Sequence, residues 1–425
     1  MKTSLILLIL IAGVGPVQPP AGNPLYDFPG SIVQKNGSTF GYLNANLNDL
    51  ATSGHYRESR AYEDSFAGPA APVRLTLAHQ RMLDAPQFII REAAKYRILL
   101  INELHNRPQH RLFTKSLLQR LHAIGYNVFM AEGIRLKNDL ANRTYPVRSD
   151  GTFLSEPTYA SLLRYAHKTG YTIHAYEPGY EKKADRYWDD SIKLDQFGSI
   201  KYISHEPRDS MTLLFDEKGL KMTIMTSVRE RSQADNILQV IKAHPSSKFI
   251  IHVGNGHLFE DGSMMGAKLR ALLKGEDVLT IDQVGLNDRI PVVDTMVHHS
   301  ISRPFSFVLQ DSITGRYFNT GMPVDYMVFS KNTGDSLQRP SFLFEDVEKR
   351  TIYYPPLNML KDCPCLLSAY YQDEYDKEGD QTIAIDVVHT RDNSRPVPLL
   401  LYKGKYIILK KDHTGKYDLF KATIN

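Results

Sequence analysis

The chain has few cysteines and no strong excess of charge of either sign, and each shortage excludes a class of protein. Only two of its 425 residues are cysteine, so it lacks the framework of a disulfide-stapled mini-protein. The formal net charge of +4 is small for this length, and no compact Lys/Arg tract occurs, which argues against nucleic acid as a partner. Hydrophobic and charged fractions of 42% and 23% are ordinary for a globular protein.

The N-terminus has the pattern of a secretory signal. Lys2 precedes an apolar run from Leu5 to Ala12, and small residues and Pro16 follow. The run is too short to cross a bilayer, and no later apolar run reaches that length. We expect residues 1–22 to be a signal peptide cleaved between about 15 and 23. The mature chain would then be periplasmic or extracellular, with no transmembrane segment; an uncleaved anchor is the alternative.

The two cysteines, Cys363 and Cys365, are separated only by Pro364. A disulfide between them would close a very tight ring. A free thiol pair or a soft-metal site is one alternative. The favoured interpretation is that both are small buried hydrophobic residues.

Strand and helix patterns alternate between residues 73 and 290. Short apolar runs typical of buried strands occupy 97–103, 126–132, 171–177, 248–253 and 278–284, and helical spacing occupies 75–94, 108–124, 157–169, 227–244 and 263–274. This alternation predicts an α/β domain with a mainly parallel central sheet covered by helices. In such folds, functional sites lie beyond the carboxyl ends of the strands.

The flanking segments follow other patterns. Residues 23–72 are rich in Gly, Asn, Ser and Tyr, which indicates an irregular lead-in. The charged segment 178–222, which contains the single tryptophan, Trp188, interrupts the alternation and is interpreted as an insertion over the site. Residues 291–425 carry short apolar runs between turn residues, which predicts a β-rich C-terminal region of unassigned role.

The segment Asn102–His110 is the most informative motif, because it directly follows the first predicted strand. In extended chain, residues i and i+2 point the same way, so Glu103 and His105 should project together. Asn106 and Pro108 suit the start of a helix, from whose first turn His110 would face the same opening. A carboxylate and two imidazoles at a sheet edge suit a metal or acid–base site, although strand ends are commonly polar anyway.

Three further features add polar residues at corresponding positions. Glu132 ends the second predicted strand. The glycines of the segment 252–258 allow a tight turn that would deliver His257 to the same edge. Arg229 and Glu230 begin the helix at 227–244, where an acid complements the helix dipole; a solvated charged face is the alternative for this pair.

These motifs, taken in order, resemble a known superfamily. Glu-x-His-x-x-x-x-His, a strand-terminal Glu, Arg-Glu-x-x-x-Ala-x-x-Ile and Gly-x-Gly-His occur together in the superfamily of erythromycin esterases, TIKI/TraB proteins and ChaN-type haem-binding proteins. The resemblance covers roughly residues 75–285 and is nearest to the ChaN/TIKI-like branch. Two positions depart from the pattern: Asn102 stands where the family usually has Gly, and Gln233 where many members have Met.

The resemblance implies a set of site residues. The candidate catalytic residues are Glu103, His110, Glu132, Arg229 and Glu230; the cofactor-binding candidates are His105 and His257; and the candidate metal ligands are Glu103, His105 and His257. The favoured hypothesis is a secreted hydrolase of ester, lactone or peptide bonds, acting on a small molecule or peptide, with a divalent Mn, Co or Zn ion that activates water. Glu132 would be its general base or a further ligand.

Other readings of the same residues remain open. In a metal-free hydrolase, His105 or His110 would activate water and Arg229 would stabilise the oxyanion. In a ChaN-type haem or iron uptake protein, an imidazole would be the axial ligand, which requires an apolar face beside it. A non-catalytic surface factor is a third possibility. The sequence does not indicate an oligomeric state.

Overall fold

A computed structural model describes residues 26–425 with several gaps. The segments left out are 39–42, 69, 137, 178–192, 195–199, 204–209, 214–224, 263, 275–277, 298–299, 302–304, 332–333 and 392–393. The expected signal peptide and most of the 178–222 insertion, including Trp188, therefore lie outside the described residues.

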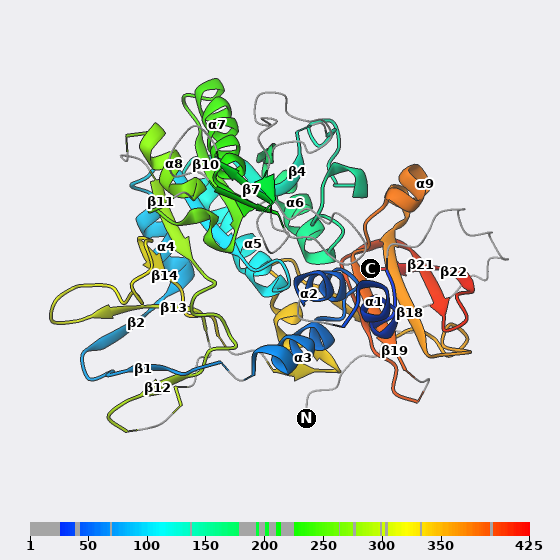
Figure 1. Ribbon diagram of the computed structural model, residues 1–425. Coiled ribbons are helices and arrows are strands. Elements are labelled where there is room, and N and C mark those ends of the chain that lie inside the picture. The colour runs from blue at the N-terminus through cyan, green and yellow to red at the C-terminus, as the bar shows by residue number, and fades with distance from the viewer. Residues whose placement is uncertain are drawn as a thin grey trace.

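The α/β part of the chain contains a six-stranded parallel sheet with the order β14-β11-β3-β10-β4-β5. Figure 1 labels β14, β11, β10 and β4 of this sheet. Its strands are β3 (Ile98–Glu103), β4 (Tyr126–Arg135), β5 (Thr172–Glu177), β10 (Lys248–Gly254), β11 (Val278–Asp282) and β14 (Tyr326–Met327). Helices cover it: α4 (Ala85–Ala93), α5 (Pro108–Ala123), α6 (Pro157–Thr169), α7 (Ser227–Ala243) and α8 (Met265–Leu272). The predicted α/β class and parallel sheet are confirmed.

The alternation of side chains along β3 creates a separate core on each face of the sheet. Leu99 and Ile101 pack in the core formed with α4, α5 and α6, whereas Ile98 and Leu100 pack in the core formed with α7 and α8. Both cores exclude water almost completely, which explains why these strands are apolar throughout. By the same alternation, Glu103 follows Leu99 and Ile101 on the α4–α6 side.

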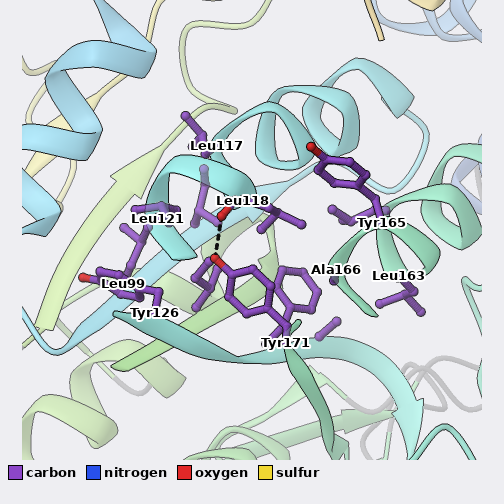
Figure 2. Packing of buried hydrophobic residues seen from close by; sticks show 14 of the residues in the cluster. Leu99, Leu117, Leu118, Leu121, Tyr126, Leu163, Tyr165, Ala166 and Tyr171 are labelled. Carbon is purple, nitrogen blue, oxygen red and sulfur yellow. Dashed lines mark hydrogen bonds between the residues drawn. The ribbon is translucent and has the colours of Figure 1, made fainter. Parts of the chain in front are cut away.

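Figure 2 shows how the first of these cores closes against the helices. Leu117, Leu118 and Leu121 of α5 lie over the buried rings of Tyr126 and Tyr171. The Tyr171 hydroxyl donates to the carbonyl of Leu118 at 2.8 Å, so the polar end of this buried ring is satisfied. This contact joins α5 to the start of β5 and fixes the helix that carries part of the candidate site.

The predicted helix at 75–94 is only half right. Residues Val73–Leu75 form β1 and Gln80–Asp84 form β2, and α4 begins only at Ala85. Pairing decides the outcome, because β2 lies antiparallel to β13 (Phe307–Asp311) and β1 lies parallel to β12 (Val292–Asp294). The Asp84 side chain then accepts a hydrogen bond from the Gln87 backbone N–H at 2.9 Å and caps the shortened helix.

The lead-in at 23–72 is not irregular, and the prediction there was wrong. It contains helices α1 (Pro29–Asn36), α2 (Leu43–Thr52) and α3 (Tyr56–Ala67). Their apolar residues are few, and two of them join a core with distant segments: Ala51 and Tyr56 pack against Leu112, Phe342 and Leu400. The periodicity of so short an apolar stripe is weak in the sequence, and the tertiary partners supply the burial.

The C-terminal region is rich in antiparallel strands, as predicted. Its main sheet has the order β19-β18-β21-β22, formed by Asp386–Thr390, Cys365–Tyr371, Gly404–Asp412 and Tyr417–Ile424. Smaller pairs join β15 (Asp335–Ser336) to β16 (Arg339–Pro340) and β17 (Thr351–Tyr353) to β20 (Leu399–Leu401); α9 spans Gln372–Glu378. Another small antiparallel sheet contains β6 (Lys193–Leu194), β7 (Ile200–Ile203), β8 (Ser210–Leu213) and β9 (Met225–Thr226).

The two cysteines do not remain separate buried thiols. Cys363 and Cys365 are joined in a disulfide at the entrance to β18, so the favoured sequence interpretation was wrong. The turn around Pro364 brings the two Cα atoms to 4.4 Å, within bonding range of a disulfide. Among the described helices, none combines the length and apolar character that a membrane span requires.

Candidate functional site

Glu103 and His105 form a hydrogen-bonded pair at the carboxyl end of β3. The Nδ1 atom of His105 lies 2.8 Å from Oε1 of Glu103, although His105 belongs to the turn Leu104–Arg107 and not to the extended strand. The imidazole stacks on the ring of Phe153, with centroids 3.7 Å apart and planes 16° from parallel. The histidine side chain is 22% exposed, against 2% for its glutamate partner. The pair therefore has a buried acid behind an imidazole that reaches the surface.

Arg111 holds Glu103 in place from the second turn of α5. Its Nε and Nη2 atoms donate to the two carboxylate oxygens, each at 2.7 Å, and its Nη1 donates to Glu156 at 2.7 Å. Burial would raise the pKa of Glu103, but the charges of Arg111 and the nearby His252 outweigh it and hold that pKa well below its usual range. Glu103 is consequently an ionised carboxylate with both oxygens bound.

Glu132 and Glu177, from the two strands beyond β10, bind one arginine. Arg229 donates to Oε1 of Glu132 at 2.5 Å and makes two hydrogen bonds of 2.8 Å to the oxygens of Glu177. Gln233 adds a 2.9 Å hydrogen bond to Glu177 from the next turn of α7. Burial opposes ionisation of Glu132, but the charges of His257 and Arg229 keep its pKa well below the usual value.

His257 lies between two carboxylates. Its Nδ1 is 2.7 Å from Oε1 of Glu230, and its Nε2 is 3.4 Å from Oε1 of Glu132. Burial disfavours protonation, but these carboxylates outweigh it and raise the pKa of His257 to about 10. The Nη1 atom of Arg229 also lies 2.9 Å from Nε2, at hydrogen-bond distance, and both side chains contact Glu132. The site thus contains two positive groups held by carboxylates.

Gly254 permits this close arrangement. A Cβ atom at this position would lie 2.7 Å from Glu132 Oε2 and 3.0 Å from His105 Nε2. The Gly254 backbone N–H also donates to the same oxygen of Glu132. The glycine that the sequence motif contributes is therefore needed for the approach of two side chains and not for an unusual backbone angle, since its φ is −74°.

Six of the seven predicted site residues converge: Glu103, His105, Glu132, Arg229, Glu230 and His257. The imidazole Nε2 of His105 lies 4.0 Å from Oε1 of Glu132, which connects the Glu103–His105 pair to the Arg229 and His257 group. His110 is placed differently. Its Nδ1 accepts a hydrogen bond of 3.0 Å from the Leu104 backbone N–H, and its side chain is buried.

Sequence reasoning missed several groups that shape the site. Arg111 is eight residues after Glu103 and directly follows His110. This closeness in sequence could have indicated its role, but an arginine there also fits an ordinary polar position on a helix. His252 is buried on β10 with its Nε2 3.6 Å from Glu103, and burial lowers its pKa to about 4. Phe153 lies in a loop that no motif marked.

The residues proposed as metal ligands do not fit a metal as they are arranged. Both oxygens of Glu103 are bound by Arg111. The two ring nitrogens of His257 face Glu230 and the Glu132–Arg229 pair. In the part of the chain that the structure describes, no group of three or more His, Cys, Asp or Glu side chains is arranged to hold a metal ion.

Comparison with known proteins adds little. No family model matches the chain, and no curated protein matches it. A solved structure of the type III effector HopBA1 matches at 13% sequence identity, covering 52% of this chain and 93% of that one, with a TM-score of 0.30. A TM-score this low carries no argument about fold or function.

Proposed function

We propose that the chain is a hydrolase of ester, lactone or peptide bonds in which His105 is the general base. The observation that carries the proposal is the geometry of the Glu103–His105 pair. The hydrogen bond at Nδ1 places the proton on that nitrogen and leaves the lone pair on Nε2. This nitrogen makes no hydrogen bond to any described residue and lies on the most exposed of the converging side chains.

The pair supplies what general base catalysis of water attack requires. A water beside Nε2 would transfer a proton to it as the water oxygen attacks the carbonyl carbon. The carboxylate of Glu103 stabilises the imidazolium that forms, and Arg111 keeps that carboxylate ionised and fixed. Proton return from Nε2 to the leaving oxygen or nitrogen then completes the hydrolysis.

The neighbouring cations support the second half of the reaction. Arg229 and His257 lie on the Glu132 side of His105, where carboxylates balance their charge, so stabilisation of a developing oxyanion would have to come from their N–H groups and not from a net positive potential. Glu132, Glu177 and Glu230 hold these cations in fixed positions, so little reorganisation is needed during reaction. Sequence motifs that resemble the erythromycin esterase, TIKI/TraB and ChaN-type superfamily also support a site of this kind.

Replacing His105 by Asn tests the proposal. Asparagine retains an N–H that can donate to Glu103 but has no basic nitrogen, so we expect kcat to fall by roughly 10²–10⁴-fold. Suitable substrates are p-nitrophenyl butyrate, δ-valerolactone and a fluorogenic peptide. His79→Asn is the matched control, because His79 is exposed and belongs to another part of the fold. Its turnover should equal that of the unaltered protein.

Two outcomes would replace the proposal by an earlier hypothesis. Loss of turnover in a chelator, with recovery on addition of Mn, Co or Zn, would establish the metal-assisted version. Absence of turnover, together with a haem Soret shift that His105→Asn or His257→Asn removes, would establish haem capture instead. If His105→Asn retains full activity, the assignment of the base is wrong.

A further inference from the structure

Two neighbouring turns, far from the candidate site in sequence, expose large apolar side chains. Met296 and Val297 lie in the turn that follows β12, with exposed fractions of 66% and 56%. Ile313 lies in the turn that follows β13 and is 70% exposed. Single exposed apolar residues are common on protein surfaces, so these three are informative only if they lie together. We refer to Met296, Val297 and Ile313 as the apolar tip.

The connector between β1 and β2 holds the two turns beside each other. The Leu75 carbonyl accepts from the Thr295 N–H at 2.6 Å, and the His79 carbonyl accepts from the Ser312 N–H at 2.7 Å. Thr295 and Ser312 directly precede the apolar residues of their turns. Even a fully extended chain from Leu75 to His79 would span only about 14 Å, so the two turns are close neighbours. In Figure 1, the loops at the ends of these strands project from the body on the left.

Three exposed arginines flank the apolar tip. Arg74 lies in β1 and Arg81 lies in β2, on either side of the connector. Arg316 closes the turn after β13, where its carbonyl accepts from the Asp311 N–H at 2.8 Å. Among the residues that the structure describes, none of the three arginines has an ion-pair partner. The acids of the two turns are Asp294 and Asp311, so the arginines outnumber them.

Both of these acids bind backbone N–H groups of their own turns. The Asp294 carboxylate accepts from the Met296 N–H at 2.8 Å. The Asp311 carboxylate accepts from the N–H groups of Ile313 and Thr314 at 2.9 and 2.7 Å. These hydrogen bonds fix the two turns, and they satisfy backbone donors at the tip that would otherwise need water. The tip can therefore leave water without losing hydrogen bonds at these positions.

We propose that the apolar tip inserts into the boundary between the headgroups and acyl chains of a phospholipid bilayer, with Arg74, Arg81 and Arg316 binding lipid phosphates. Insertion removes the apolar side chains from water, and a bilayer accepts them on projecting turns without a matching shape. Guanidinium groups bind phosphate oxygens through paired N–H donors. A protein partner would instead need a pocket shaped to the tip and carboxylates opposite the arginines. The tip is small, so this docking should be weak and reversible.

Flotation of the full chain with vesicles of equal parts phosphatidylcholine and phosphatidylglycerol tests the proposal. The double variant Met296→Asp, Ile313→Asp should bind roughly tenfold less than the unaltered protein, because the new carboxylates cannot enter the apolar boundary. The matched control is Ile352→Asp, Leu357→Asp, which makes the same charge change at exposed apolar positions in the C-terminal region. It should keep most of the binding. Circular dichroism should show both variants folded, since all four positions are exposed.

A label at the tip provides a second measurement. Ile313→Cys introduces a free thiol, whereas Cys363 and Cys365 are bonded to each other. The fluorophore NBD attached to this thiol should become brighter and shift to the blue when vesicles are added, and spin-labelled phosphatidylcholine should quench it. The same label on Leu357→Cys should show neither change.

Several results would overturn the proposal. Equal flotation of the tip variant and the unaltered protein would place the contact elsewhere, and no flotation of the unaltered protein would remove it. Flotation that Arg81→Gln, Arg316→Gln leaves unchanged would show that these arginines bind no phosphate. A dimer in light scattering that the tip variant separates would make this surface an interface between copies of the chain. His105→Asn should float normally, so failure of the hydrolase proposal and failure of this one are separately visible.

Discussion

Arg111 donates to both carboxylate oxygens of Glu103, at 2.7 Å each, and neither side chain is more than 2% exposed. The two residues come from α5 and the end of β3, so the pair locks the helix to the sheet at the candidate site. The same arginine donates to the backbone carbonyl of His105 at 3.0 Å. One buried cation thus fixes both the acid and the peptide that carries the proposed base.

Arg111→Met should leave Glu103 as a buried carboxylate without a counter-ion. We expect the free energy of unfolding to fall by about 3–5 kcal/mol, measured by urea denaturation. The double variant Arg111→Met, Glu103→Gln should recover part of that loss because it removes the charge. Arg91→Met is the control: Arg91 pairs with Glu92 but is 59% exposed, so its loss should cost less than about 1 kcal/mol.

His257 should make the free energy of unfolding fall as the pH becomes alkaline. Its pKa is about 10 in the folded protein and near 6.5 when unfolded, so its contribution is complete below pH 6.5 and disappears as the pH rises through 10. The difference in unfolding free energy between the unaltered protein and His257→Asn should therefore shrink between pH 7 and 10, by at most about 4 kcal/mol.

The control for this pH effect is His174→Asn. Burial lowers the pKa of His174, so its stability contribution is lost as the pH falls and stays constant above pH 7. The difference in unfolding free energy between His174→Asn and the unaltered protein should not change with pH over the alkaline range. A flat difference for His257→Asn as well would contradict an imidazolium at the site.

Gly254→Ala should disrupt the site by steric contact. The added Cβ would lie within 3.0 Å of His105 and closer still to Glu132, and neither can move freely. We expect a loss of about 1–3 kcal/mol in unfolding free energy and a large fall in turnover. In Gly30→Ala, the added Cβ has nothing within 4 Å and the residue lies in α1, so stability should hold or rise slightly.

Asn102→Gly should destabilise this chain. The Asn102 side chain donates to Asp282 at 2.6 Å and accepts from the Gln283 N–H at 2.8 Å, joining β3 to β11. Loss of these buried hydrogen bonds should cost about 2–3 kcal/mol by thermal or urea unfolding. Asn142→Gly, at an exposed position with one local hydrogen bond, should cost less than half as much.

The sequence predicted the sheet and much of the site because its signals were local. The helix predicted at 157–169 matches α6 residue for residue, since Glu156 caps it and Gly170 ends it in a left-handed turn. The pairing of Glu103 with His105 is also local, because the two residues are two positions apart, at the end of β3 and in the turn that follows it. Both predictions depended on residues within a few positions of one another.

Contacts between distant segments decided the rest. No local pattern indicates that Arg111 would bind Glu103, that β2 would pair with β13, or that α1–α3 would find a core among residues far along the chain. By itself, the sequence determined which strands are buried and which polar residues stand at their ends, because periodicity and turn residues act locally. Only the tertiary structure decided which of those residues meet and that Glu103 faces a guanidinium, because a buried charge takes whichever partner the packed elements bring to it.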